Sequence, residues 1–231
     1  MQMRDRDQLL SSKAAARKLG VHESRIRALA SHDRLGARKL GGRWVIDSNA
    51  LLREMQRSRE RGRPYDPKNG FALLFLASGE RPNWIRPDVR SRLQRRLAEG
   101  SLKRDLPRLR GRARRLSVRA GESALRAIQK DRDFIKSGVS AAIEYAADIS
   151  APGVIEGYYP ADKLAAVIYR YALREVDEAQ ANLIVHELGA PIPFAKRSVM
   201  PAAVVAVDLL EAGDARSRRA GQKLLRSIEA R

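Results

Sequence analysis

The sequence predicts a protein of the α+β class, in which helices and strands follow one another without a regular alternation. Apolar residues recur at intervals of three and four in several segments, which is typical of amphipathic helices. Short apolar runs such as GVIEGYYP and ANLIVHEL are typical of buried strands. The 231 residues, of which 44% are hydrophobic, suffice for one large domain or two modest ones with a real core.

The first elements predicted along the chain are two short helices joined by a tight turn. Ser11 or Ser12 can cap a helix over residues 13–19, because a serine hydroxyl accepts a hydrogen bond from an unpaired backbone N–H. Gly20 can end this helix in the left-handed conformation that glycine tolerates. A second helix is expected over residues 25–30.

These two helices meet the steric demands of a helix-turn-helix unit. Such a unit needs a small residue where the helices cross, a glycine in the turn and a branched apolar anchor in the second helix. Ala16, Gly20 and Ile26 supply these in order. Ser24 can cap the second helix, whose exposed start would then be free to enter a groove of DNA.

A hairpin and a third helix are expected next. Residues 39–46 predict a β-hairpin whose turn is Gly41-Gly42, a pair able to adopt the positive φ angles of a tight turn. A capped helix is expected over residues 49–59. The polar stretch RSRERGRPYDP, with two prolines, then marks the expected domain boundary.

Beyond this boundary, FALLFLASGE predicts a buried helix that ends near Gly79. Residues 86–119 contain 13 basic and 3 acidic residues, and their leucine spacing predicts two short helices and a strand with basic outer faces. The rest predicts helices over ESALRAIQK and ADKLAAVIYRYAL, the two strands named above, and a closing pair of helices. We therefore expect a DNA-binding domain over 1–61, a basic, mainly helical segment over 62–119 and a neutral α+β domain over 120–231.

The net charge of +19 is concentrated in the first half of the chain. Residues 1–119 contain 31 Lys and Arg against 12 Asp and Glu, whereas residues 120–231 contain 15 of each. A GC-rich genome could explain the preference for Arg over Lys, but codon bias does not decide where the acidic residues lie. A surface that is basic on one side attracts polyanions, with nucleic acid as the usual partner.

The first part of the chain resembles the excisionase/MerR-type winged helix-turn-helix family, through the segment SSKAAARKLGVHESRIRALASHDRLGARKLGGRWVIDSNALLR. In that family the second helix lies in the major groove and the hairpin, or wing, lies on the phosphate backbone. One departure is Asp33, where the family often has glycine, and this can shift the turn before the wing. The resemblance implies an N-terminal winged helix-turn-helix over about residues 9–60.

The resemblance also implies which residues contact DNA. Arg25 and Arg27 are expected at base edges, because Arg can make a bidentate contact to guanine O6 and N7. Ser24 and Lys13 are expected at phosphates. The full set expected at DNA is Lys13, His22, Glu23, Ser24, Arg25, Arg27, Arg34, Arg38, Lys39 and Arg43. Any single Arg can equally be a solvated surface charge, and Trp44 either packs under the hairpin or stacks on a base.

The order of parts along the whole chain resembles the AbiEi-like antitoxin regulators of bacterial type IV toxin–antitoxin systems. In those proteins the winged helix represses the promoter of its own operon and the C-terminal domain counteracts a nucleotidyltransferase toxin. The resemblance implies a transcriptional autorepressor that is also an antitoxin, with double-stranded DNA near its own gene and a cognate toxin as partners.

The basic residues 86–119 have three possible roles: they contact further phosphates, they face an acidic partner protein, or they simply face water. The accessory basic residues considered for DNA are Arg95, Arg96, Arg112 and Arg114.

The sequence offers no constellation of residues for an enzyme or a metal centre. His22 and His32 lie in the DNA-reading unit, and His186 ends an apolar strand without a second ligand at metal spacing. Glu144 and Asp148 share a helix face at i and i+4, which is usually a solvated face. We expect no catalytic activity, no metal and no cofactor.

Several alternatives and limits follow from the same sequence. The chain contains no cysteine, so it has no disulfide frame. It also contains no apolar run of about 20 residues and no signal-peptide core. We therefore expect a cytoplasmic protein without a membrane span. A ligand- or partner-responsive regulator remains an alternative, although the long dimerisation helix of MerR proteins is missing. An excisionase-like architectural protein and an RNA binder also remain, and the oligomeric state stays open.

Overall fold

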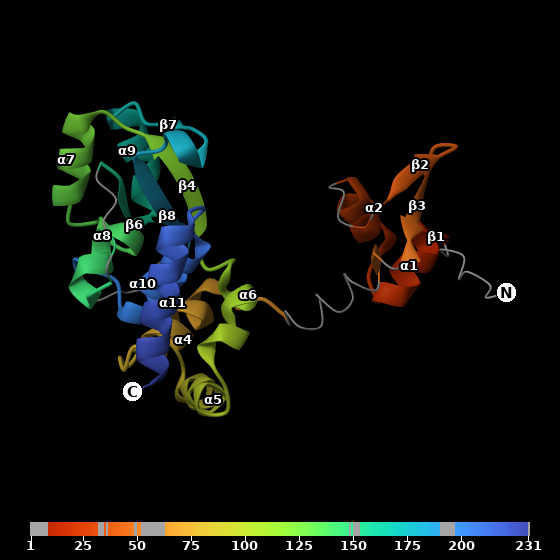
Figure 1. Ribbon diagram of the computed structural model, residues 1–231, viewed down its shortest axis with the longest axis horizontal. Helices are drawn as coiled ribbons and strands as arrows, with labels where there is room; N and C mark the ends of the chain where they lie inside the picture. The colour runs from red at the N-terminus through yellow and green to blue at the C-terminus, as the bar shows by residue number, and fades with distance from the viewer. Residues whose placement is uncertain are drawn as a thin grey trace. The chain divides into compact units, whose positions relative to one another are not determined.

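The computed structural model describes residues 9–31, 35, 37–48, 50–51, 63–147, 149, 153–189 and 197–230. The chain divides into two compact units, Met1–Gly62 and Arg63–Arg231, here called the N-terminal and C-terminal units (Figure 1). Each unit combines helices with a β-sheet, which confirms the α+β class.

The described part of the N-terminal unit is a helix pair on a three-stranded antiparallel sheet. Its elements are β1 (Leu9–Ser11), α1 (Ser12–Leu19), α2 (Glu23–Ser31), β2 (Arg38–Leu40) and β3 (Arg43–Asp47). β3 lies between β1 and β2. β1 was not expected, because three residues are too few to show a strand's alternation. Of the helix expected over residues 49–59, the structure describes Ala50 and Leu51, which are helical, and the rest lies outside the described residues.

The turn between α1 and α2 forms largely as the sequence predicts. The Ser11 hydroxyl accepts a hydrogen bond from the backbone N–H of Ala14, and Gly20 ends α1 with a φ of 65°. α2 begins at Glu23, two residues earlier than expected. His22 precedes the helix, and the His22 carbonyl accepts a hydrogen bond from the Arg25 N–H at 3.0 Å. The predicted capping role of Ser24 is therefore wrong. Its hydroxyl instead lies 3.0 Å from His22 Nδ1.

The core of the N-terminal unit forms where the two helices cross. Ala16, the small residue expected at the crossing, is buried, and its neighbour Ala15 and the α2 anchor Ile26 are fully buried in the same cluster. Ile46 of β3 belongs to the same cluster, and Trp44 packs against it while half-buried. The structure favours the packing role of Trp44, because the side chain packs against the buried cluster of the N-terminal unit.

The C-terminal unit is a five-stranded mixed sheet with helices on both faces. Its helices are α4 (Pro67–Ala77), α5 (Pro87–Ala98), α6 (Leu106–Leu109), α7 (Glu122–Lys130), α8 (Gly138–Ala141), α9 (Ala161–Arg170), α10 (Ala202–Glu211) and α11 (Ala215–Glu229). Short 3-10 helices are η1 (Leu102–Arg104), η2 (Ala142–Tyr145) and η3 (Glu178–Gln180). The strands are β4 (Arg114–Arg119), β5 (Ile135–Lys136), β6 (Ile155–Pro160), β7 (Arg174–Glu175) and β8 (Leu183–Leu188).

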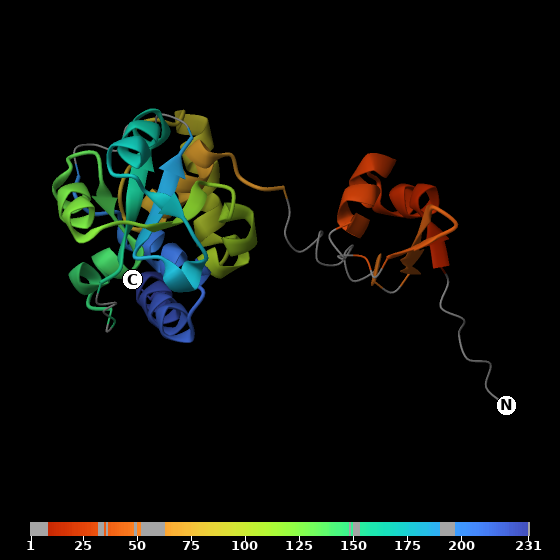
Figure 2. The ribbon, with the colours of Figure 1, turned by 90° about the horizontal axis from the view of Figure 1, so that it is seen from above.

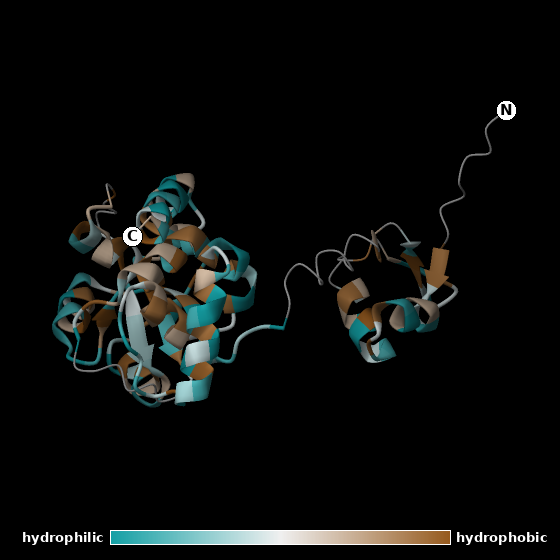
Figure 3. Cartoon of the chain, turned by 90° about the horizontal axis from the view of Figure 1, so that it is seen from below, coloured by the Kyte–Doolittle hydropathy of each residue, from teal (hydrophilic) through white to brown (hydrophobic). Residues whose placement is uncertain are grey.

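The strand order is β5-β6-β8-β4-β7, and only the β6–β8 pair among these strands is parallel. Because successive side chains of a strand point to opposite faces, Tyr158 and Tyr159 of β6 enter two different cores. Tyr158 packs with α4, α10 and α11, and Tyr159 packs with α7 and α9. Several helices carry hydrophilic and hydrophobic residues along the same helix, as amphipathic helices do (Figure 3).

The basic segment expected over residues 62–119 is part of the C-terminal unit and not a separate body. Leu93, Leu102 and Leu109 are buried in the same core as Leu224 of α11. The net charge of the sequence changes at residue 119, but residues on both sides of this position share one core. The division between the two compact units lies at residues 62 and 63 instead.

α10 is the centre of this core. Its residues Ala203–Leu209 are all buried, and apart from Asp208 they are apolar on every side of the helix. No helix within the described ranges is both long enough and apolar enough to cross a membrane.

Candidate nucleic-acid interface

Helix α2 turns one side inward and the other side to solvent. Its buried residues are Ile26, Leu29 and Ala30. At about 100° per residue the opposite side is centred on Ser24 and Ala28, with Arg25 and Arg27 on the two flanks. Small side chains at the centre allow the helix to approach base edges closely, and the flanking guanidinium groups can reach bases or phosphates.

The two flanking arginines have different surroundings. Arg27 Nη2 donates to Glu23 Oε1 at 3.0 Å, and the Ser12 hydroxyl donates to the same oxygen at 2.5 Å. The hydrogen bond from Ser12, followed by that from Arg27, lowers the pKa of Glu23. Arg25 makes no ion pair with any residue that the structure describes. Arg25 is therefore available for a base, whereas Arg27 is held beside Glu23.

A groove of about 500 Å³ lies between the first turns of the two helices and the wing, the hairpin formed by β2 and β3. Its lining cations are Lys13, Arg27, Lys39 and Arg43. Glu23 lines the same groove, and Lys39 Nζ lies 5.2 Å from the ring centroid of Trp44. A concave surface with four cations around one carboxylate suits a backbone phosphate of DNA.

The wing turn has the geometry that its two glycines predict. Gly41 and Gly42 have φ angles of 55° and 76°, and Leu40 pairs with Arg43 across the turn. Positive φ at both central residues is the mark of a type I′ turn, which matches the twist of the strands. The hairpin therefore holds its cations at fixed positions on an exposed ribbon.

The structure shows where the residues expected at DNA lie. The exposed ones are Lys13, His22, Ser24, Arg25, Arg27, Arg38, Lys39 and Arg43. Glu23 is half-buried, and Arg34 lies outside the described residues, as do His32 and Asp33. Ser12, which ties Glu23 to α1, and Ala28 were missed. The helical spacing of Ala28 from Ser24 is the signal that could have identified Ala28.

Arg112 is the clear correction among the accessory basic residues. It is 3% exposed, and its guanidinium contacts Asp208, Glu211 and the Tyr158 hydroxyl. Burial by itself would lower the pKa of Arg112, but Tyr158 and the two carboxylates hold it well above its usual range. Arg112 is a buried structural cation and cannot contact a phosphate, because its charge is already compensated inside the core.

The other accessory cations lie at the surface to different degrees. Arg96 holds Asp105 with hydrogen bonds of 2.8 and 2.9 Å, and its side chain is 43% exposed. Arg114 Nη1 lies 3.3 Å from Glu187, and Arg95 lies 3.9 Å from Glu99. Of these three contacts the one between Arg95 and Glu99 is the longest, so Arg95 is the least tightly held of the three arginines.

His186 has the structural role expected for it. Its Nε2 lies 2.9 Å from Glu156 Oε1, and its ring stacks on Tyr158 with 4.7 Å between centroids. Glu144 lies on η2 and not on the expected α-helix, and Asp148 lies outside the described residues. Across the described part of the chain no group of three or more His, Cys, Asp or Glu could hold a metal ion.

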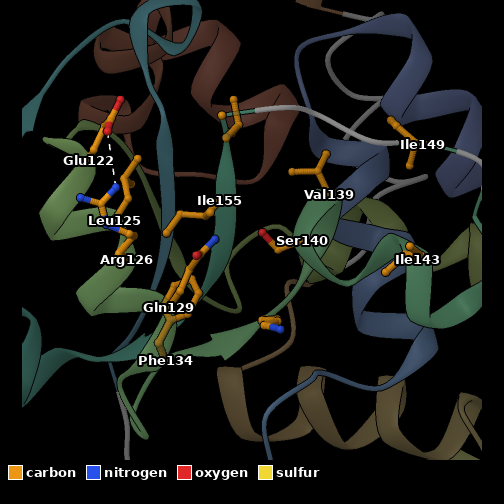
Figure 4. Close-up of a pocket in the computed structure, with 13 residues that line it drawn as sticks. Glu122, Leu125, Arg126, Gln129, Phe134, Val139, Ser140, Ile143, Ile149 and Ile155 are labelled. Atoms are coloured by element: carbon orange, nitrogen blue, oxygen red, sulfur yellow. Dashed lines mark hydrogen bonds and ion pairs between the residues drawn. The ribbon is translucent and has the colours of Figure 1, made fainter.

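A larger groove of about 840 Å³ opens in the C-terminal unit (Figure 4). Leu125 and Arg126 of α7 lie along one side of it, with Val139 of α8 and Ile143 of η2 on the other. Arg126 donates to Glu122 at 3.4 Å on the same helix. Ile143 is 80% exposed, so part of the rim is apolar, whereas Glu122, Gln129 and Lys136 add polar groups to the lining.

Residues 9–59 match the model of a protein family described as a helix-turn-helix domain. No curated protein and no solved structure matches the chain. The matched range contains α1, α2 and the wing, which are the elements that form the cationic groove. The N-terminal unit therefore contains a helix-turn-helix domain over the matched residues.

Proposed function

We propose that the protein is a sequence-specific regulator of transcription that binds duplex DNA through α2 and the wing. The observation that carries this proposal is the outward face of α2, where Ser24 and Ala28 lie between Arg25 and Arg27 beside a cationic groove. The helix-turn-helix match over residues 9–59 supports the same conclusion.

Different parts of this domain contact the bases and the phosphates of the DNA. α2 enters the major groove, where Arg25 reads a guanine with about 1–3 kcal/mol of discrimination. The wing and the cationic groove hold phosphates, which fixes the register of the helix on the duplex. Each neutralised phosphate releases counterions, so the logarithm of the affinity falls with the logarithm of salt by about 0.9 per contact.

The regulator represses its own promoter in this proposal. The test is a binding titration of the full chain against the DNA upstream of its own gene, with a shuffled duplex of equal length and composition as the control. The expected result is a preference for the upstream fragment that persists as salt is raised. Equal affinity for the two duplexes would exclude sequence-specific autorepression.

An antitoxin role is a further part of the proposal, and only the order of parts along the sequence supports it. In this role the C-terminal unit counteracts a nucleotidyltransferase-type toxin. The test is co-expression with such a toxin from the neighbouring gene, comparing the full chain with its Arg25→Gln variant. Rescue of growth by both proteins is expected, because protection would not need DNA binding. Failure of both to rescue would exclude the role.

The groove in Figure 4 favours a second candidate, a regulator whose DNA binding responds to a small ligand. Its volume and mainly apolar walls are those of ordinary ligand sites. The test is operator binding in the presence of a dialysable cell extract. Release that is lost on filling the groove with Leu125→Trp would support this candidate, and no release would exclude it.

A further inference from the structure

The last helix of the chain carries a row of cations on its outer side. The row, here called the α11 stripe, consists of Arg216, Arg219, Lys223 and Arg226. Its spacings of three, four and three residues keep all four side chains on one side of the helix, and all four are exposed. From end to end the row spans about 15 Å. α11 lies at the outer edge of the C-terminal unit in Figure 2, where it is dark blue.

Packing fixes which side of α11 faces solvent. Ala220, Leu224 and Leu225 are buried on the side opposite the stripe. Gly221 allows a close approach to α10, since a Cβ atom there would lie 2.8 Å from the carbonyl oxygen of Ala206. The helix cannot rotate without opening this contact, so the stripe is held outward.

The cations of the stripe have no acidic partners among the described residues, in contrast to several arginines elsewhere in the C-terminal unit. Arg112, Arg115 and Arg197, for example, each contact at least one carboxylate. The first turn of α11 contains cations and no acidic residue. Positive charge is unfavourable there, because the N-terminus of a helix carries the positive end of the helix dipole. Only Asp214, which caps the helix, offsets this charge locally.

Further exposed cations lie near the end of the helix. Glu229 near the end of α11 accepts a hydrogen bond of 2.5 Å from Ser101, which places η1 beside that end. Lys103 and Arg104 of η1 are exposed there. The whole C-terminal unit has 31 Lys and Arg against 20 Asp and Glu, so it is strongly basic despite the neutral second half of the sequence.

The chemistry of the stripe fits phosphates better than a protein. The core of a protein interface is apolar and poor in lysine, and α11 bears no large exposed apolar residue. A straight row of one sign matches the regular line of charge along a nucleic-acid strand.

We propose that the C-terminal unit makes a second, sequence-independent contact with duplex DNA, through phosphates that bind the α11 stripe. This inference rests on the proposed function, because the duplex is the one that α2 reads. The stripe adds affinity and salt dependence, and α2 alone supplies the preference for sequence.

The test uses the full chain and two fluorescent duplexes, the upstream fragment and its shuffled control, over a series of salt concentrations. The stripe variant is Arg219→Gln/Lys223→Gln/Arg226→Gln. The matched control, Lys130→Gln/Arg170→Gln/Arg174→Gln, removes the same charge from exposed positions on α7, α9 and β7. The variant Arg219→Lys/Arg226→Lys changes the same side chains but keeps their charge, so it shows whether substitution at these positions disturbs the fold.

The expected result is a salt slope that falls by about two to three in the stripe variant, since each lost phosphate contact is worth about 0.9. Affinity should fall by the same factor for both duplexes, and the control and the lysine variant should keep the wild-type slope. Unchanged DNA binding by the stripe variant would overturn the proposal and leave an acidic protein as the partner. An equal fall in the matched control would also overturn it, because net charge alone would then explain the effect. If the wild type bound the upstream fragment and the shuffled duplex with equal affinity, the result would instead contradict the proposed reading of DNA sequence by α2.

Discussion

The guanidinium of Arg112 lies against the carboxylate of Asp208 inside the C-terminal unit, although 96 residues separate them in the sequence. Glu211, one turn further along α10, holds the same guanidinium at 2.9 Å. This buried contact ties the basic segment before β4 to the most buried helix of the core. It explains why the charge boundary in the sequence is not a structural boundary.

Loss of the Arg112 charge should destabilise the C-terminal unit strongly. Arg112→Met would leave Asp208 buried without its cation, which costs about 3–5 kcal/mol when one partner of a buried pair is removed. The measurement is the free energy of unfolding from urea denaturation. The double variant Arg112→Met/Asp208→Leu should recover part of the loss, because the pair is then removed together.

Arg95→Met is the control for this experiment, since its side chain is 71% exposed and changes at such positions stay within about 0.5 kcal/mol. An unfolding free energy for Arg112→Met equal to that of the control would contradict the structural role of Arg112.

A cavity at the helix crossing should unfold the N-terminal unit alone. Ile26 is fully buried, so Ile26→Ala should cost about 2–5 kcal/mol in that unit. Each unit contains one of the two tryptophans, Trp44 and Trp84, so Trp84→Phe isolates the fluorescence of the first unit. In Ile26→Ala/Trp84→Phe the Trp44 transition should move to lower urea, whereas in Ile26→Ala/Trp44→Phe the Trp84 transition should stay in place. A shift of both transitions would show that the units unfold as one.

The two arginines that flank α2 should differ in their effect on DNA recognition. Arg25→Gln should remove about 1–3 kcal/mol of preference for the upstream fragment over the shuffled duplex, because a bidentate base contact is lost. Arg27→Gln should weaken both duplexes alike, because Arg27 stays beside Glu23 and lines the phosphate groove. Competition titrations measure both quantities, and equal loss of preference in the two variants would refute this division.

The cap of α11 should make stability depend on acid pH. Hydrogen bonds from the side chain and the backbone N–H of Ser217 lower the pKa of Asp214. A depressed carboxyl pKa stabilises the folded state above the unfolded value of about 3.9, and this stability is lost as the pH falls through the folded value. Asp214→Ala should cost about 1 kcal/mol near neutral pH.

Asp214→Asn separates the charge from the hydrogen bond in this prediction. The wild type should be more stable than Asp214→Asn at neutral pH, and the difference should shrink below about pH 4 as Asp214 is protonated. Urea denaturation at both pH values measures the difference. A gap that widens in acid would contradict the assigned direction of the pKa shift.

Sequence reasoning reached the local features because they depend on neighbouring residues. The Ser11 cap, the stop at Gly20 and the Gly41-Gly42 turn each follow from the conformational preferences of one or two residues. The start of α2 was missed by two residues because His22, which is not a common cap, precedes the helix.

The features that the sequence did not show depend on residues far apart in the chain. Nothing near Arg112 indicates that α10 brings Asp208 and Glu211 to it, so it was counted among the surface cations. The α11 stripe was hidden for another reason, because its four cations are balanced by acidic residues elsewhere in the second half. Net charge over a segment does not show on which face the charge lies.

A site-specific cross-linking experiment tests the central claim most directly, and the absence of cysteine from the chain makes it clean. Ala28→Cys places a single thiol at the centre of the outward face of α2, and Ala166→Cys places one on the exposed side of α9 as the control. Each variant carries a thiol-linked photoreactive group and is bound to the upstream duplex. We predict covalent attachment to the DNA from position 28 and none from position 166. Bound DNA that is not cross-linked from position 28 would contradict the assignment of α2 as the reading helix.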